Sequence, residues 1–173
     1  MNLPNKLTLA RIVAVPFFIV FYFLKWYWPA LIIFVLASLT DMADGKIARK
    51  YNMVTNFGKI MDPLADKILV YAAFCMMVGD KTIAAWTLIV ILFREFLVAG
   101  VRTVAASTGT VIAADMAGKI KTVLQMFAVP CLLIRSVHPV LFYCGYVLFY
   151  ASLIMTAVSG ANYCLKNKEV FEG

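Results

Sequence analysis

Residues 41–49 read Asp41-Met-Ala-Asp44-Gly45-Lys-Ile-Ala48-Arg49, and residues 58–66 read Gly58-Lys-Ile-Met-Asp62-Pro-Leu-Ala-Asp66. Long apolar runs flank these two segments, so four carboxylates interrupt a strongly hydrophobic part of the chain. An ionisable group within a membrane segment is costly and therefore indicates a functional site. Because charges of one sign repel one another unless cations lie between them, the pattern predicts binding of divalent metal.

The composition predicts an all-α integral membrane protein. Hydrophobic residues make up 64% of the 173 residues and only 14% are charged, far from the average of soluble domains. A spanning helix needs about 20 apolar residues, and the chain, without linker or repeat, is expected to form a single domain over residues 1–173. We predict six transmembrane helices: Leu7–Lys25, Pro29–Arg49, Phe57–Val78, Ile83–Ala106, Lys119–Arg135 and Val140–Leu165.

The basic residues predict how the chain lies in the cell membrane. With a cytoplasmic N-terminus, thirteen of the sixteen lysines and arginines fall on the cytoplasmic side, and only Lys25, Lys81 and Arg135 fall outside. This bias follows the positive-inside rule, so both termini and the aspartates should face the cytoplasm. Attraction to anionic membrane lipids then explains the net charge of +7, and no nucleic-acid partner is needed.

Helical geometry would turn the aspartate spacing into a site. At about 100° per residue, the acidic and small residues of each segment share one helix face: Asp41, Asp44, Gly45 and Ala48 on the first, and Gly58, Asp62 and Asp66 on the second. If the two helices face each other, four carboxylates meet in one pocket. Oxygen ligands suit Mg²⁺, Mn²⁺ or Ca²⁺, whereas zinc normally recruits His or Cys. The alternative is a set of salt bridges with nearby lysines and arginines, which would not require glycine beside the acids.

The spacing of these residues also resembles a family signature. Asp-x-x-Asp-Gly-x-x-Ala-Arg, eight residues, then Gly-x-x-x-Asp-x-x-x-Asp is similar to the motif of the CDP-alcohol phosphotransferases, and every fixed position is present here. The resemblance extends over nearly the whole chain. It implies a small six-helix membrane enzyme that moves a substituted phosphate from a CDP-linked donor to an alcohol and releases CMP.

The resemblance implies roles for individual residues and two divalent cations, Mg²⁺ or Mn²⁺. Asp41, Asp44 and Asp62 would be metal ligands, and Asp66 would lie at the edge of the cluster. Asp66 is also the candidate general base that takes the proton of the incoming hydroxyl. The residues implied in nucleotide and diphosphate binding are Asn5, Thr8, Asp41, Asp44, Gly45, Ala48, Arg49 and Gly58. Arg49 would meet the diphosphate with its forked donors or, alternatively, anchor its helix at the membrane edge.

The N-terminal pattern Asn5-x-x-Thr8-x-x-Arg11 resembles the beginning of many family members. In them, a short amphipathic segment lies on the cytoplasmic face and helps to enclose the nucleotide. A helix cap at Asn5 or Thr8 fits the same sequence.

A second basic group lies in the later helices: Arg94, Arg102, Lys119 and Lys121. Arg94 and Arg102 are about 80° apart around a helix, so they share a face with Val98 between them. As a set, these cations predict a pocket for a phosphate on the acceptor alcohol. Ordinary positive-inside anchoring is the alternative for each of them singly.

The surroundings of this group indicate a branch of the family. Arg94-Glu95-Phe-Leu-Val-Ala-Gly-Val-Arg102, followed by Gly118-Lys119-Ile-Lys121-Thr122-x-x-Gln125, resembles the branch that uses CDP-diacylglycerol as donor and sn-glycerol 3-phosphate as acceptor. Glu95 is expected to pair with a neighbouring base, and Asp115 could cap the helix before Lys119. Family analogy also favours a homodimer.

Three other functions compete with this interpretation. Within the family, the alternative is a synthase that uses inositol phosphate or another alcohol. Outside it, a cation- or proton-coupled transporter could use the aspartates as its pathway, although transporters usually break helices at matching midplane positions in two halves. A non-catalytic membrane scaffold would have no use for the four carboxylates.

Overall fold

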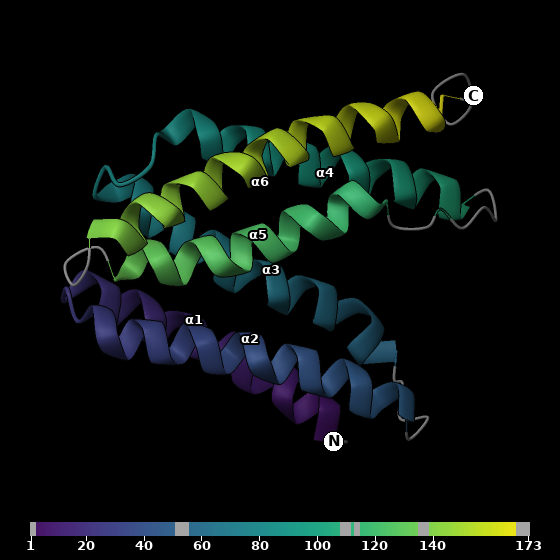
Figure 1. Ribbon diagram of the computed structural model, residues 1–173. Coiled ribbons are helices and arrows are strands. Elements are labelled where there is room, and N and C mark those ends of the chain that lie inside the picture. Colours follow the sequence, from purple (N-terminus) through teal and green to yellow (C-terminus); the bar gives the residue numbers. More distant parts are fainter. Residues whose placement is uncertain (1–2, 51–55, 108–111, 113–114, 135–138, 169–173) are drawn as a thin grey trace.

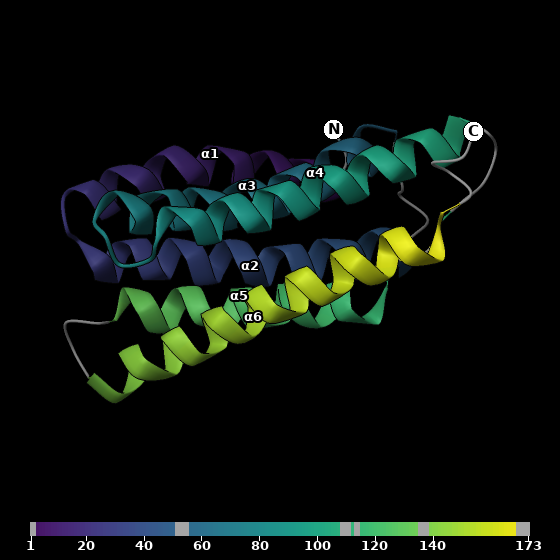
Figure 2. The ribbon, with the colours of Figure 1, turned by 90° about the horizontal axis from the view of Figure 1, so that it is seen from above.

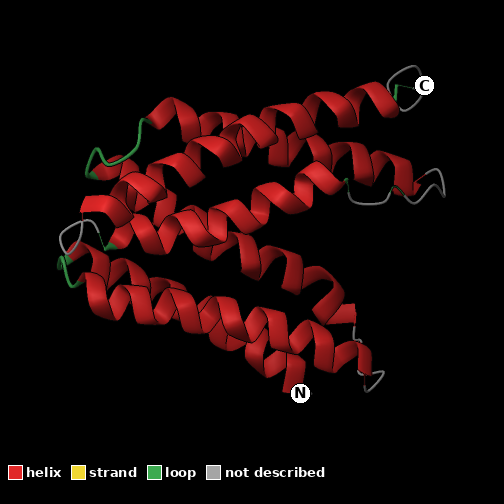
Figure 3. Ribbon diagram, viewed as in Figure 1, coloured by secondary structure: helices red, strands yellow, loops and turns green. Residues whose placement is uncertain are grey.

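The computed structural model describes residues 3–50, 56–107, 112, 115–134 and 139–168; within these, the side chains of residues 3, 4, 41–50, 56–60, 62, 63 and 66 fall outside the description. Over this part of the chain the protein consists of helices and short turns, with no strand (Figure 3). The helices are α1 (Leu3–Phe23), α2 (Tyr27–Lys50), α3 (Asn56–Gly79), α4 (Ala85–Ser107), α5 (Met116–Leu133) and α6 (Pro139–Lys166). The prediction of an all-α chain is confirmed.

The six helices form an elongated bundle in which successive helices run in opposite directions along one long axis (Figures 1 and 2). The starts of α1, α3 and α5 and the ends of α2, α4 and α6 lie at one end of the bundle, here called the terminal end. The turns that join α1 to α2 and α3 to α4 lie at the opposite end. Both aspartate segments therefore belong to the terminal end, together with the described ends of the chain.

Length and composition allow three of the described helices to cross a membrane: Asn5–Phe23, Met116–Leu133 and Pro139–Lys166. Two shorter apolar stretches, Tyr27–Thr40 and Lys67–Gly79, belong to α2 and α3; the side chains of the neighbouring aspartate segments fall outside the description. Bulky apolar side chains also point outward from the bundle, including Phe17, Phe93 and Val147. A soluble protein rarely exposes so much contiguous apolar surface, so the chain is a membrane protein.

The N-terminal segment differs from the prediction. Instead of a separate amphipathic segment, the structure has one continuous helix that begins at Leu3 and includes Pro16. Asn5, Thr8 and Arg11 follow one face of α1 and are buried, with 8%, 0% and 2% of their surfaces exposed. Since polar side chains inside an apolar bundle need partners, this face lies against the bundle interior and not on the membrane surface.

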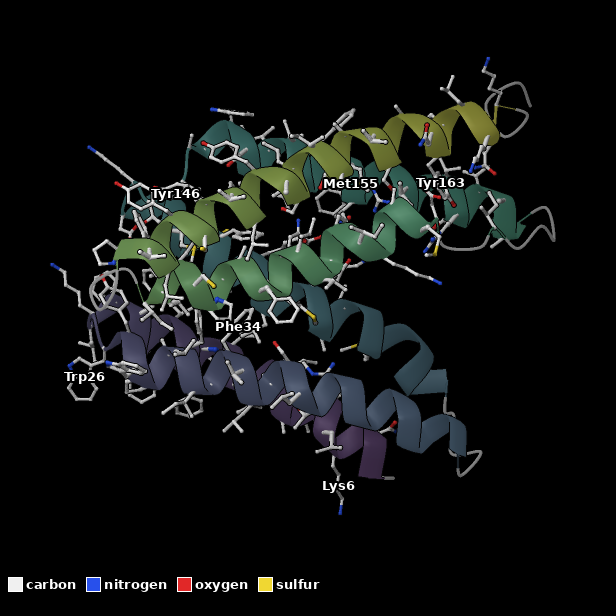
Figure 4. All side chains as sticks on the ribbon, in the orientation of Figure 1. Lys6, Trp26, Phe34, Tyr146, Met155 and Tyr163 are labelled. Carbon is white, nitrogen blue, oxygen red and sulfur yellow. The ribbon has the colours of Figure 1, made fainter. Side chains whose placement is uncertain are left out.

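Aromatic side chains fill the interior between the helices. Phe74 and Phe149 meet edge to face with ring centroids 5.2 Å apart, and Phe18 lies 6.2 Å from Phe34. Figure 4 shows Phe34 pointing from α2 toward α5. Lipid tails are as apolar as these rings, so burial in the bundle adds no hydrophobic driving force within the membrane. Close packing and favourable ring geometry therefore stabilise this core.

A polar cluster joins α1 and α6 to the turn between α3 and α4, at the end opposite the terminal end. The Tyr22 hydroxyl donates a 2.6 Å hydrogen bond to Asp80 Oδ2, and the Thr82 N–H donates to Asp80 Oδ1 at 3.0 Å. Tyr146 on α6 donates to the carbonyl of Thr82. Trp26 lies at the same end in Figure 4. Aromatic side chains of this kind favour the membrane–water interface, so this end has the properties of a bundle end at the membrane surface.

Gly145 allows α5 and α6 to approach closely. A Cβ atom added at Gly145 would lie 3.0 Å from the Cβ of Cys131 and 3.0 Å from the backbone nitrogen of Leu132. Small residues permit such contact between membrane helices. Because one of the obstructing atoms belongs to the backbone, a larger residue would push the helices apart.

We predict that Gly145→Ala lowers the free energy of unfolding by about 1–3 kcal/mol through overpacking. Gly100→Ala is the matched control, because nothing lies within 4 Å of the added Cβ and alanine favours a helix over glycine by about 0.5–1 kcal/mol. Thermal unfolding of the purified proteins in detergent checks this. A Gly145→Ala protein that melts no lower than Gly100→Ala contradicts the role assigned to Gly145.

Candidate functional site

The aspartate segments occupy the end of α2 and the start of α3, both at the terminal end of the bundle. Asp41 and Asp44 lie in the C-terminal turns of α2, and Asp62 and Asp66 lie in the N-terminal turns of α3. The predicted helical conformation of both segments is confirmed, and α2 packs against α3. Helical periodicity places each aspartate pair on one side of its helix.

The side chains that would hold metal and nucleotide lie outside the described residues: Asp41, Asp44, Gly45, Ala48, Arg49, Gly58, Asp62 and Asp66. Among the side chains that the structure does describe, no group of three or more His, Cys, Asp or Glu residues could hold a metal. The metal site thus stays a prediction from the spacing of these residues.

The basic residues of the later helices surround one cavity at the terminal end, here called the basic pocket, with a volume of about 440 Å³. It is lined by Lys67, Arg94, Glu95, Val98, Ala99, Arg102, Asp115, Gly118, Lys119, Lys121, Thr122 and Val123. The structure brings all four predicted basic residues together, two from α4 and two from α5. Val98 lines the same wall as the two arginines, as the helical spacing requires.

Glu95 makes ion pairs with cations from three helices. Its Oε1 accepts a 2.8 Å hydrogen bond from Arg94 Nη1 and another from Lys121 Nζ, and its Oε2 lies 3.2 Å from Lys67 Nζ. The predicted pairing of Glu95 with a neighbouring base is confirmed. Lys67 was not predicted to take part, and the sequence signal for it is weak because Lys67 follows Asp66 in a segment dominated by the aspartates.

Arg94 occupies a slot shaped by glycine and serine. Its Nη2 donates a 2.5 Å hydrogen bond to Ser159 Oγ on α6. A Cβ at Gly118 would lie 2.9 Å from the same Nη2, and a Cβ at Gly160 would lie 3.1 Å from Arg94 Cγ. The side chain is therefore held between α5 and α6. Sequence reasoning missed Ser159 and Gly160 because uncharged residues in an apolar helix carry no distinctive pattern.

Arg102 and Lys119 form the exposed rim of the basic pocket. Arg102 Nε donates to the Tyr163 hydroxyl at 3.2 Å, and the guanidinium carbon lies 5.7 Å from the centre of the Tyr163 ring. Figure 4 shows Tyr163 near the terminal end of α6. These contacts leave both Arg102 Nη groups available for a ligand, since the ring supports the cation from one face.

Asp115 occupies the predicted N-cap position of α5, with extended backbone angles. Its side chain makes no capping hydrogen bond, so Asp115 stands at the N-cap position without capping the helix. The carboxylate instead lines the basic pocket, and its Oδ2 is buried without a hydrogen-bond partner.

The charges of the basic pocket favour an anion. Five cations line it, namely Lys67, Arg94, Arg102, Lys119 and Lys121, against the carboxylates Glu95 and Asp115. This surplus of three positive charges, counted from the lining residues, attracts a dianion such as a phosphate monoester. Lys67 belongs to α3 and directly follows Asp66, so the pocket begins on a helix that also carries two of the aspartates.

Comparison with known proteins supports the family that the spacing of the aspartates indicates. The model of the CDP-alcohol phosphatidyltransferase family matches residues 1–158. A CDP-diacylglycerol–glycerol-3-phosphate 3-phosphatidyltransferase of Bacillus subtilis (strain 168) is 44% identical, with 99% of this chain and 97% of the relative covered. The proteins of the same name from Rickettsia bellii (strain RML369-C) and Salmonella typhimurium (strain LT2) are 38% and 35% identical and cover 98% and 94% of this chain, with 97% and 92% of their own lengths covered. The chain belongs to the CDP-alcohol phosphatidyltransferase family.

Proposed function

We propose that the protein transfers the phosphatidyl group of CDP-diacylglycerol to sn-glycerol 3-phosphate, which yields phosphatidylglycerophosphate and CMP. The observation that carries this proposal is the basic pocket, which begins on the aspartate-bearing helix α3 and suits an acceptor that is itself a phosphate monoester. The names of the relatives, each similar over nearly its whole length, support the same reaction.

The proposed metal site uses Asp41, Asp44, Asp62 and Asp66 to bind two divalent cations, Mg²⁺ or Mn²⁺. All four donors are carboxylates, as hard cations prefer, and they come from the ends of two helices that pack together. When bound, the two cations would polarise the donor phosphate and neutralise the charge of the leaving group. Membership of the CDP-alcohol phosphatidyltransferase family supports the use of divalent metal.

The remaining roles of the site fall to the chain's own residues. Asp66 takes the proton of the attacking glycerol hydroxyl. The hydroxyl oxygen bonds to the phosphorus that carries the diacylglycerol, and the bond from that phosphorus to the CMP oxygen breaks. Arg49 binds the diphosphate, and the small residues leave space for the nucleotide: Gly45, Ala48 and Gly58. Asn5 and Thr8 lie on the buried face of α1 at the terminal end, where they can close the nucleotide site.

We further propose that all six helices span the membrane as one domain, with the terminal end in the cytoplasm. Both described ends of the chain lie at that end in Figures 1 and 2, and thirteen of the sixteen basic residues belong to that side. The nucleotide headgroup of the donor and the glycerol 3-phosphate acceptor are both water-soluble groups, and both would reach the site from the cytoplasm. By analogy with the family, the active form is a homodimer.

The deciding experiment for the function is a product assay. Purified protein, CDP-diacylglycerol and Mg²⁺ receive glycerol 3-phosphate, glycerol, inositol phosphate or serine in turn, and CMP release is measured. We expect rapid release with glycerol 3-phosphate and very slow release with glycerol. A preference for inositol phosphate supports the related synthase, and a preference for serine or glycerol contradicts the acceptor assignment while leaving the metal site unaffected.

The first prediction about the proposed reaction concerns the metal ligands. CMP release should require Mg²⁺ or Mn²⁺, stop in excess chelator and return when metal is added back. Asp41→Asn, Asp44→Asn and Asp62→Asn should each abolish turnover, because an amide holds the cation poorly and leaves the other carboxylates to repel one another. Full activity in excess chelator contradicts the metal-dependent mechanism.

The second prediction separates the base from the ligands. Asp66→Asn should lower CMP release by several orders of magnitude with near-normal binding of CDP-diacylglycerol, since an amide cannot accept the hydroxyl proton. Binding of the donor and single-turnover CMP release are measured separately. If the variant retains a large fraction of turnover, another group is the base.

The third prediction concerns the rim of the basic pocket. A charge-assisted hydrogen bond to phosphate contributes about 1.5–3 kcal/mol, so Arg102→Gln or Lys119→Gln should each lower kcat/KM for glycerol 3-phosphate by about tenfold to a hundredfold. The KM for CDP-diacylglycerol should change little. Lys6→Gln is the control, because Lys6 is exposed and points away from the bundle in Figure 4. An equal loss in the control would mean that the effect is general to the membrane surface.

A further inference from the structure

Glu95 is the carboxylate on which the buried part of the basic pocket converges. Glu95, Arg94 and Lys121 are 8%, 9% and 3% exposed, while the Lys67 side chain is 45% exposed. Contacts at 2.8 Å to Arg94 and 3.2 Å to Lys67, and a further one to Lys121, connect α4, α3 and α5. One anion therefore holds cations contributed by three separate helices.

The arrangement would not persist without this anion. Two buried cations side by side repel each other strongly in surroundings of low polarity, and burial removes the water that would otherwise screen them. Without Glu95, the Lys121 ammonium and the Arg94 guanidinium would lose the carboxylate oxygen that they share and would repel each other, and Lys67 would lose its contact with Oε2. Ser159 would still accept one hydrogen bond from Arg94, but it carries no charge to offset the repulsion.

We propose that Glu95 is a positioning residue of the acceptor pocket, which fixes Lys67, Arg94 and Lys121 so that a phosphate monoester meets cations already in place. This inference rests on the proposed function, because the ligand it concerns is the acceptor phosphate. Glu95 acts through the three cations and does not itself touch the phosphate, since a carboxylate repels that ligand. Fixed donors lower the cost of ordering side chains when the ligand binds.

The direction in which the KM for glycerol 3-phosphate changes distinguishes a positioning role of Glu95 from a simple effect of its charge. Replacing Glu95 with a neutral residue makes the pocket more positive by one charge, and by Coulomb attraction alone this should strengthen binding of an anion. Loss of the fixed positions of Lys67, Arg94 and Lys121 should instead weaken binding of the anion. Cations that are no longer held in place must be ordered when the phosphate binds, which costs affinity, so the positioning role predicts weaker binding despite the added positive charge.

The test compares Glu95→Gln with Asp115→Asn. Both variants remove one carboxylate from the lining of the same pocket, but the Asp115 side chain makes no capping hydrogen bond and its Oδ2 has no hydrogen-bond partner. We expect Glu95→Gln to raise the KM for glycerol 3-phosphate by about tenfold to a hundredfold, as the loss of one charge-assisted hydrogen bond to the phosphate would, with the KM for CDP-diacylglycerol unchanged. Asp115→Asn should lower the acceptor KM, because it makes the pocket more positive by one charge without removing a carboxylate that holds the cations in place. If Glu95→Gln also leaves or lowers the acceptor KM, the positioning role is wrong.

Two further variants keep the test decisive if Glu95→Gln does not fold. Glu95→Asp retains the charge but withdraws the carboxylate by one methylene from all three cations, so the acceptor KM should again rise. Lys67→Gln changes a half-exposed side chain and should raise the acceptor KM with donor KM unchanged. Wild-type acceptor KM values in both variants would overturn the inference. Failure of the unaltered protein to use glycerol 3-phosphate would instead contradict the proposed function, and the two failures are thus distinguishable.

Discussion

Charge inside an apolar helical bundle persists only where an opposite charge, a hydrogen bond or a ligand accompanies it, and the arrangement of this protein follows from that constraint. Glu95 satisfies it for Arg94, Lys121 and Lys67 within the protein itself. The basic pocket as a whole still carries more cations than carboxylates, and the two aspartate segments together carry four aspartates against three basic residues. Two neighbouring regions of unbalanced charge, one requiring anions and the other cations, suit a reaction between two phosphate-bearing substrates assisted by metal.

Glycine lets the bundle combine close packing with a polar site. In lipid, helices gain little from burying apolar side chains, and close contact between them matters more. Gly145 provides such contact between α5 and α6 in the apolar half of the bundle. At the terminal end, Gly118 and Gly160 leave space for a buried arginine side chain. The same residue type therefore serves helix packing in one place and the shape of the site in another.

Much of the fold could be predicted, because an apolar run of spanning length with polar or aromatic ends can hardly form anything but a helix in a membrane. The largest departure is the start of α1, expected at Leu7 and found at Leu3. Hydropathy treats Asn5 as polar and places it outside the helix, whereas Asn5 lies within α1 and is buried on the same face as Thr8. For the site, the four basic residues could be found from their charge, but Ser159 and Lys67 could not.

The spacing of residues within each functional segment follows from the sequence alone: in a helix, Asp62 and Asp66 must lie on one side, and so must Arg94 and Val98. Such relations depend only on the backbone geometry of a single helix. The tertiary structure alone decided that Lys67, Glu95 and Lys121 would meet and that Gly118 would face Arg94. Contacts between helices depend on how three helices are rotated and shifted against one another, and side-chain packing sets those rotations and shifts.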